Sequence, residues 1–243
     1  MADITRQLSG YEIVKRVLST LGLGVPNSIA SSSDTMAVQI WALLTECGQA
    51  LLGEYDWQWL QKTHTINTVP GTLSYPVPAD LDRFLNTAAW NKTSQLPLAG
   101  PLSGQSWSFL QARQLGGSTL QLQFTIRGDQ LEFYSVPSVA QVLALEYQSR
   151  GWVRDATNPT TFKDFAEGDG DTILYDPQLI IAYLKYKWRE AKGFETSALE
   201  RAYLKALAAA QAKDSPGVDL PISSRSSAGL IGGFNLPVTG YGQ

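Results

Sequence analysis

Residues 120–136, Leu-Gln-Leu-Gln-Phe-Thr-Ile-Arg-Gly-Asp-Gln-Leu-Glu-Phe-Tyr-Ser-Val, carry the clearest strand pattern in the chain. Apolar and polar side chains alternate in the first half, as they do in a strand whose two faces meet different surroundings. The Arg-Gly-Asp-Gln sequence at 127–130 predicts a turn, after which the alternation resumes. Residues 142–149 alternate in the same way. We therefore predict three antiparallel strands in a meander.

The residues before this meander also have a strand period. Residues 62–69 alternate, Pro70 and Gly71 occupy the central positions of a type II turn, and residues 72–77 run back. This pattern predicts a β-hairpin. A further strand is expected over residues 81–92, and a short helix over residues 105–115.

The N-terminal part of the chain has helical spacing instead. Ser9 and Glu12 have the spacing of a capping box, in which each side chain satisfies a backbone N–H of the first turn. Apolar residues then recur every three or four positions as far as Leu21. A longer helix is predicted after Ser33 or Asp34, ending near residues 53–55.

The same spacing returns near the other end. Asp176 is suited to cap a helix and Pro177 to occupy its first position, because proline lacks the N–H that would be left unpaired there. This helix is expected to end at Lys192-Gly193. Another follows over residues 196–214. The polar stretch 155–171 is predicted to be a loop.

Helices at both ends with strands between them indicate an α+β fold. We predict a helical bundle from the N- and C-terminal helix pairs, with a β-rich insertion and an extended C-terminal tail. The predicted boundaries are 1–61 and 172–213 for the helical bundle domain, 62–171 for the antiparallel β-rich insertion domain, and 214–243 for the tail.

Composition excludes several classes of protein. Charged residues make up 17% of the 243 residues, below the usual ~25%, so part of the surface is expected to contact a partner. The 19 basic and 22 acidic residues argue against a dedicated nucleic-acid-binding protein. One cysteine and one histidine exclude a disulfide framework and a multi-histidine metal centre. No apolar stretch is long enough to cross a membrane, and we predict no cofactor, no metal and no catalytic residue.

A few residues have chemistry that requires a specific interpretation. His64 lies in an alternating strand without a catalytic signature nearby, so an ordinary half-exposed strand histidine is expected rather than a catalytic one. Cys47 lies on the apolar stripe of a helix, where a buried structural thiol is expected. The Gly-Asp-Gly-Asp sequence at 168–171 is reminiscent of a calcium loop but has no glutamate in the twelfth position. A flexible acidic loop is the favoured interpretation.

The last two helices carry basic residues interleaved with glutamates. This mixture favours a solvated or subunit-contacting face, with nucleic-acid binding as the alternative. The candidate interface residues are Lys185, Arg189, Lys192, Arg201 and Lys205.

The last thirty residues combine glycine, serine and proline with apolar side chains. Disordered segments are usually charged and poor in apolar groups, and this one is the reverse. We predict that it docks in an extended form onto a partner, against an idle disordered end as the alternative. The candidate contact residues are Leu220, Ile222, Leu230, Ile231, Phe234, Leu236, Val238 and Tyr241.

Three stretches together resemble a known family. They are Leu-Leu-Gly-Glu-Tyr-Asp-Trp-Gln-Trp at 51–59, Gly-Thr-Leu-Ser-Tyr-Pro-Val-Pro-Ala-Asp-Leu-Asp-Arg at 71–83, and the helix at 176–193 with its Trp-Arg-Glu-Ala-Lys-Gly end. Their order, over residues 11–214, is similar to that in head-to-tail adaptor (connector) proteins of tailed bacteriophages, particularly short-tailed ones.

The resemblance implies a structural virion protein that is not an enzyme. Such adaptors form a ring homo-oligomer, usually a dodecamer, below the portal protein. The ring extends the DNA channel and docks tail components such as the tail nozzle, while double-stranded DNA passes through without specific binding. The C-terminal tail is then expected to contact the portal. The expected location is the neck or tail region of the virion, after assembly in the host cytoplasm.

Two other functions remain open. One is another tail or baseplate component, which is also structural. The other is a virion-associated cell-wall hydrolase, for which Glu132 and Glu146 are the paired carboxylates available. Both lie in predicted strands, with no supporting acid–base group nearby in sequence.

Overall fold

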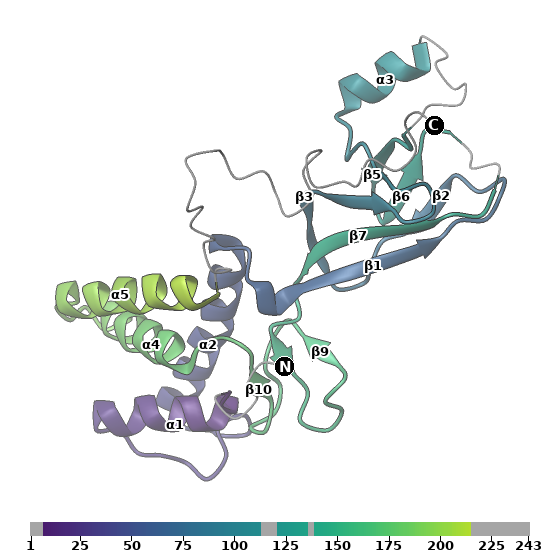
Figure 1. Cartoon of the computed structure of the whole chain (residues 1–243). Helices are drawn as coiled ribbons and strands as arrows, with labels where there is room; N and C mark the ends of the chain where they lie inside the picture. Colours follow the sequence, from purple (N-terminus) through teal and green to yellow (C-terminus); the bar gives the residue numbers. More distant parts are fainter. Residues whose placement is uncertain (1–6, 113–120, 136–138, 215–243) are drawn as a thin grey trace, which may run out of the picture.

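The computed structural model describes residues 7–112, 121–135 and 139–214. Helices gather at one end and strands extend away from them at the other (Figure 1). The helices of the first part are α1 (Gly10–Leu21), α2 (Thr35–Glu54), α4 (Pro177–Ala191) and α5 (Ser197–Asp214). A short 3-10 helix (Gln58–Leu60) follows α2, and α3 (Gly104–Ala112) lies in the β-rich part. The predicted α+β class is confirmed.

The helices begin where their capping residues predict. The Ser9 hydroxyl accepts a hydrogen bond from the Glu12 N–H at 3.2 Å, and Asp34 accepts from the Met36 N–H at 3.1 Å. Side-chain oxygens satisfy backbone donors that the first turn of a helix leaves unpaired. Asp176 caps α4 in the same way, with Pro177 at its first position.

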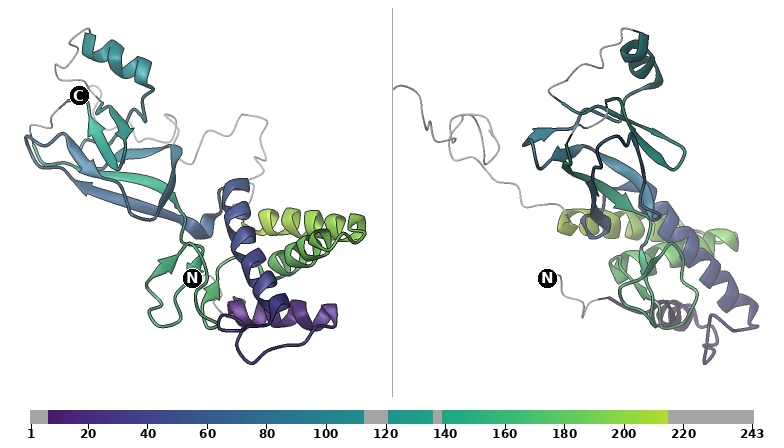
Figure 2. Two further views of the ribbon diagram at one scale, coloured as in Figure 1. Left: turned by 180° about the vertical axis from the view of Figure 1, so that it is seen from behind. Right: turned by 90° about the vertical axis from the view of Figure 1, so that its right-hand side faces the viewer.

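Helix α4 is central in the helical part. It packs against α1, α2 and α5, and the right-hand view of Figure 2 shows α5 and α2 towards opposite edges. Apolar side chains from all four helices form one buried cluster, and burying each such side chain contributes about 1.5–3 kcal/mol. Its fully buried members in the helices include Ile13, Leu18, Ile40, Leu44, Leu51 and Leu184.

The strands form three antiparallel sheets. The largest has the order β1 (Gln61–Asn67), β7 (Val142–Ser149), β3 (Leu81–Asn91), β4 (Leu96–Pro97). A second contains β2 (Ser74–Pro76), β6 (Gln130–Phe133) and β5 (Phe124–Arg127). The third contains β10 (Thr172–Ile173), β8 (Val153–Arg154) and β9 (Phe162–Lys163), so residues 155–171 are not entirely loop as predicted.

The predicted hairpin around Pro70 and Gly71 is wrong, although its turn forms. Thr72 N–H donates to the Val69 carbonyl at 3.1 Å, and Gly71 has φ +91°. The flanking strands then separate, since β1 pairs with β7 and β2 pairs with β6. Strand β7 offers β1 a ladder of seven residue pairs, whereas β2 is three residues long and ends in proline. Proline has no N–H to donate and shortens a ladder.

The predicted meander is also wrong in its last strand. Strands β5 and β6 form the expected hairpin, with Gly128 at φ +57° in the turn. Strand β7 leaves this sheet and inserts between β1 and β3. It is buried on both faces along most of its length, as a central strand requires.

Buried side chains form two clusters, one in the helical part and one in the β-rich part. The domain boundaries given above stay a prediction. The second cluster joins the two larger sheets and includes Ile66, Phe124, Leu131, Phe133, Leu143 and Leu145. Trp152, Val153 and Ile173 belong instead to the helical cluster. Of the predicted tail, residues 215–243 lie outside the described part of the chain.

Candidate partner-binding site

Arg83, near the start of strand β3, joins the β-rich part to the helices. Its terminal nitrogens both donate to the Leu52 carbonyl at 3.2 Å, in the last turn of α2. Its Nε and one terminal nitrogen also donate to Asp56 Oδ1, at 3.0 and 2.7 Å. Carbonyls at the end of a helix have no partner within it, so a cation there satisfies them and the helix dipole together.

Asp80 lies directly before strand β3 and connects its start to β1 and β7 at the same junction. Its carboxylate accepts from Lys62 Nζ and the Ser149 hydroxyl, each at 2.7 Å, and from the Tyr147 hydroxyl at 2.9 Å. Burial raises the pKa of Asp80, but the hydrogen bonds from Lys62, Ser149 and Tyr147 outweigh it and lower that pKa to about 2. The carboxylate is therefore charged at neutral pH.

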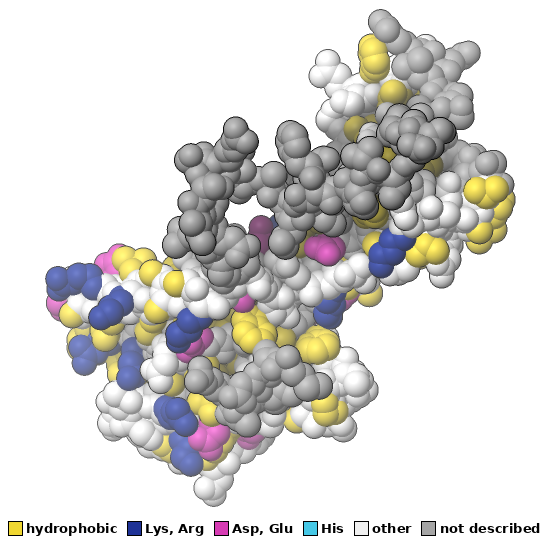
Figure 3. All heavy atoms as spheres, in the orientation of Figure 1, with side chains coloured by type: hydrophobic (Ala, Val, Ile, Leu, Met, Phe, Trp, Pro, Cys, Tyr) yellow, Lys and Arg dark blue, Asp and Glu magenta, His cyan; other side chains and the backbone are white. Residues whose placement is uncertain are grey.

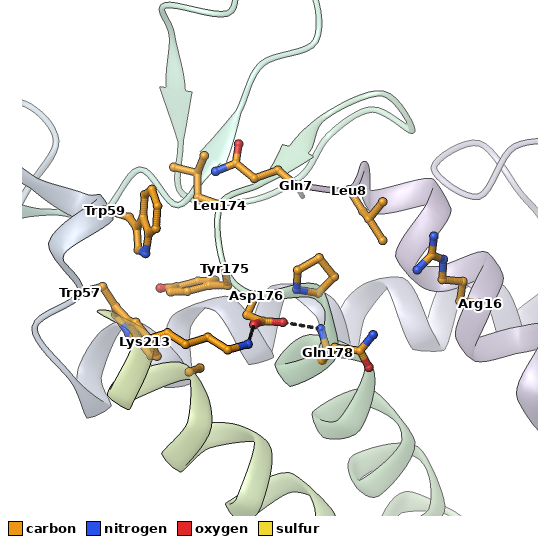
Figure 4. Close-up of a pocket in the computed structure, with 12 residues that line it drawn as sticks. Gln7, Leu8, Arg16, Trp57, Trp59, Leu174, Tyr175, Asp176, Gln178 and Lys213 are labelled. Atoms are coloured by element: carbon orange, nitrogen blue, oxygen red, sulfur yellow. Dashed lines mark hydrogen bonds and ion pairs between the residues drawn. The ribbon is translucent and has the colours of Figure 1, made fainter. Parts of the chain in front are cut away.

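A cavity of about 540 Å³ opens beside this junction, between the start of α1, the 3-10 helix and the ends of α4 and α5 (Figure 4). Its wall is aromatic. Trp57 is buried, donates its Nε1–H to the Leu51 carbonyl at 2.7 Å and meets Tyr175 edge to face, with ring centroids 5.5 Å apart. Trp59 is half exposed.

Charged and amide groups line the rest of the cavity. Lys213 forms an ion pair with Asp176 at 2.9 Å, and Arg16 lies at the end of the cavity away from Trp59 (Figure 4). Gln7 also lines it, with a buried side-chain oxygen that has no hydrogen-bond partner among the described residues. Aromatic rings beside two cations and amides can bind a peptide segment with apolar and acidic groups.

Helix α5 ends at the rim of this cavity. The carboxylate of Asp214 accepts from the Gln58 N–H at 2.8 Å, and burial raises the pKa of Asp214. The chain therefore leaves the described part within reach of the cavity. The eight predicted tail contacts, at positions 220–241, lie outside the described residues.

The five basic residues predicted to contact another subunit divide between two surfaces. Lys185 and Arg189 lie on α4 and Lys192 is the residue directly after it, and Lys185 lies beside α1 in a shallow groove. Arg201 and Lys205 are exposed on the outer face of α5. Figure 3 shows that Lys and Arg side chains gather over these helices. The interface itself stays a prediction.

The other residues singled out from the sequence do not assemble into a catalytic group. Cys47 is fully buried, which raises the pKa of its thiol, and His64 is half buried on β1. Glu132 lies on β6 beside Arg127, at 3.6 Å, whereas Glu146 lies on β7 in a different sheet. The structure does not bring the two carboxylates together on one strand pair.

The acidic sequence at 168–171 has a structural role. Asp169 accepts from the backbone N–H groups of Ile29 and Ala30 at 3.0 and 2.9 Å, tying two distant loops together. Asp171, which is buried, accepts from the N–H groups of Ala156, Glu167 and Gly168. The segment is thus held in place by hydrogen bonds rather than being a free acidic loop. Over the described residues, no cluster of His, Cys, Asp and Glu side chains is arranged to hold a metal ion.

The sequence interpretation missed the cavity and the roles of Asp80 and Arg83. Both residues lie within the quoted stretch 71–83, but nothing local in that stretch identifies their partners at Leu52 and Lys62. Three residues that stood out in the sequence, Trp57, Trp59 and the capping residue Asp176, all line the cavity. Nothing in the sequence shows that they lie close together.

Comparison with known proteins identifies the family. A family model described as SU10 adaptor protein matches residues 12–222, which is most of the chain. The chain belongs to this family. The SU10 adaptor match confirms the resemblance to phage head-to-tail adaptors, and with it a structural role in the virion and in tail assembly. No curated protein matches the chain. Among the described residues, no helix is long and apolar enough to span a membrane.

Proposed function

We propose that this protein forms a ring below the portal of a tailed phage, and that this phage is short-tailed. The ring, a dodecamer by resemblance, extends the DNA channel and docks tail components such as the nozzle. The observation that carries this proposal is the family match over residues 12–222. Other tail or baseplate positions are the structural alternative.

The surface chemistry of the helical part supports a ring. A closed ring uses two different surfaces of each subunit, one for each neighbour. The basic residues of α4 and α5 and the outer side of α2, where Glu46 is exposed, supply two such surfaces. A slightly acidic subunit can line a DNA channel without gripping the DNA, since phosphate binding needs clustered cations.

The C-terminal segment is the proposed contact with the portal. Its apolar side chains, from Leu220 to Tyr241, share the segment with only two charged residues, Asp219 and Arg225, and the described chain ends at Asp214 beside the cavity. Extended segments of this kind dock through backbone hydrogen bonds and pocketed side chains. Residues Lys185, Arg189, Lys192, Arg201 and Lys205 are proposed to contact neighbouring subunits.

The same proposal holds that the protein is not an enzyme and has no cofactor. A cell-wall hydrolase would need two carboxylates facing one substrate. Glu132 and Glu146 lie in different sheets, and this arrangement favours the structural role.

The deciding experiment mixes the purified protein with its portal ring and counts bound copies by native mass spectrometry or cryo-electron microscopy. The intact chain should form a defined complex in the neck position. A variant lacking residues 215–243 should bind more weakly while keeping its circular dichroism spectrum. Equal binding by both chains would contradict the role of the segment, and absence of any complex would contradict the portal assignment. An assay on purified cell wall tests the hydrolase alternative.

A further inference from the structure

Helix α2 has an outer face that no described element of the chain covers. Its inner face carries Ile40, Leu44 and Leu51, all fully buried. Residues on the opposite side follow at helical spacing and are all exposed, namely Thr35, Val38, Ala42, Glu46, Gln49 and Gly53. Glu46 is the single charge among them, and it makes no ion pair with any described residue.

Helix α5 has a matching outer face. Its inner face carries Tyr203, Leu207 and Ala210. The opposite side is exposed and consists of small residues with two cations near its start, in the order Ala198, Arg201, Lys205, Ala208 and Ala212. Arg201 donates to the Ser197 carbonyl of its own helix. Neither Arg201 nor Lys205 forms an ion pair with an acidic side chain of the described residues.

We propose that the outer face of α5 in one copy packs against the outer face of α2 in the next copy. Arg201 and Lys205 then lie beside Glu46 of the neighbour. Two observations carry this inference: the two faces are exposed, and their unpaired charges have opposite sign.

A second copy of this chain suits both faces better than another partner does. Small side chains let two helices approach to the close end of the usual 8–10 Å range, which large residues on either helix would prevent. Because the two surfaces differ, the contact is head-to-tail and leaves a free face at each end of a dimer. It therefore adds further copies, and these close into a ring when the rotation from one copy to the next divides a full turn. The inference rests on the proposed ring but is tested separately from portal binding.

The first test is cross-linking between copies. A Glu46→Cys/Lys205→Cys variant is treated with a short bismaleimide, alone at high concentration and on portal rings, while Cys47 is buried and protected. We expect a ladder of multimers. An equal mixture of the two single variants should stop at dimers, and either single variant alone should give none. An Asp129→Cys/Lys205→Cys control places one thiol in the exposed β5–β6 turn and should give no ladder.

The second test reverses charges. Arg201→Glu/Lys205→Glu should weaken association between copies by about tenfold or more, because it sets like charges against Glu46 of the neighbour. Adding Glu46→Lys to the same chain should restore most of the association. A purely structural effect of the first two changes would not be rescued by a change on another helix.

The third test uses bulk. A Cβ added at Gly53 meets no described atom within 4 Å, and Gly53 is exposed, so Gly53→Phe should fold normally yet obstruct the neighbour. Gly104→Phe is the matched control, since Gly104 is equally open but lies at the start of α3. Only the change at Gly53 should abolish the ladder.

The outcomes separate the two claims. A ladder without portal binding would support this contact and contradict the portal assignment. Portal binding without a ladder, on or off the portal, would overturn this contact and leave the adaptor role intact. Dimers from Glu46→Cys alone would indicate a two-fold contact of α2 with itself and would also overturn it.

Discussion

Arg83 caps helix α2 from another part of the fold by donating both of its terminal nitrogens to the Leu52 carbonyl at 3.2 Å. The contact makes the start of strand β3 and the end of α2 one unit. Replacing the guanidinium would leave a helix end and Asp56 without their partner.

Arg83→Ala should lower the free energy of unfolding by about 1–2 kcal/mol, since hydrogen bonds to a charged group contribute about 1.5–3 kcal/mol and this one is partly exposed. Urea denaturation followed by circular dichroism measures the change. Arg189→Ala is the control, because Arg189 is exposed on α4, and it should change stability by less than about 0.5 kcal/mol. Equal effects would contradict the capping role.

The same substitution should act in opposite directions at two glycines of α2. At Gly48 a methyl group would overlap the indole of Trp152, which is fully buried, so Gly48→Ala should cost about 3 kcal/mol. At Gly53 the added group meets nothing, and Gly53→Ala should stabilise by about 0.5–1 kcal/mol through helix propensity. Thermal unfolding of both variants checks the difference in sign.

Asp171 should give the protein a defined acid sensitivity. Burial raises the pKa of Asp171, but hydrogen bonds from the N–H groups of Gly168, Glu167 and Ala156, with the charge of Lys163, lower that pKa below its ordinary value. A lowered folded-state pKa contributes stability that is complete above about pH 4, the ordinary value for aspartate, and is lost as pH falls through the folded pKa.

Asp171→Asn should therefore cost about 2 kcal/mol at pH 7, and the difference from the natural protein should shrink below about pH 4. Denaturation curves at pH 7 and pH 3 measure it. Asp129→Asn, in an exposed turn, serves as the control. A difference that is the same at both pH values would show that the carboxylate charge is not responsible.

The two tryptophans of the cavity should contribute very differently to the stability of the fold. Trp57 is 3% exposed, so Trp57→Ala should cost about 3–5 kcal/mol. Trp59 is 50% exposed, so Trp59→Ala should cost less, about 1–2 kcal/mol, and leave the fold intact. The loss of stability is read from chemical denaturation. A large loss at Trp59 would mean that it belongs to the core.

The sequence predicts local features of this fold well and distant ones poorly. Ser9, Asp34 and Asp176 mark their helices because a cap and its backbone donor are two or three residues apart. The Pro70-Gly71 turn is local too, and it forms.

Strand partners depend on residues far away in the chain. His64 pairs with Leu145, and no pattern around His64 distinguishes that partner from the residues just beyond the turn. The candidate site also depends on residues that are distant in the sequence. Lys213 and Asp176 meet in the cavity through the packing of two helices, so their ion pair could not be foreseen from either helix alone.

The ladder between β1 and β7 brings the two ends of the β-rich segment side by side. Gln61 and Gln148 are direct partners at its base, where antiparallel chains lie about 5 Å apart. A tight two-residue turn could therefore replace everything between them without moving either end. We expect such a shortened chain to keep the helical spectrum of the natural protein but to be less stable, because it loses the Arg83 cap on α2. We expect the corresponding segment of another family member to be accepted at the same two positions.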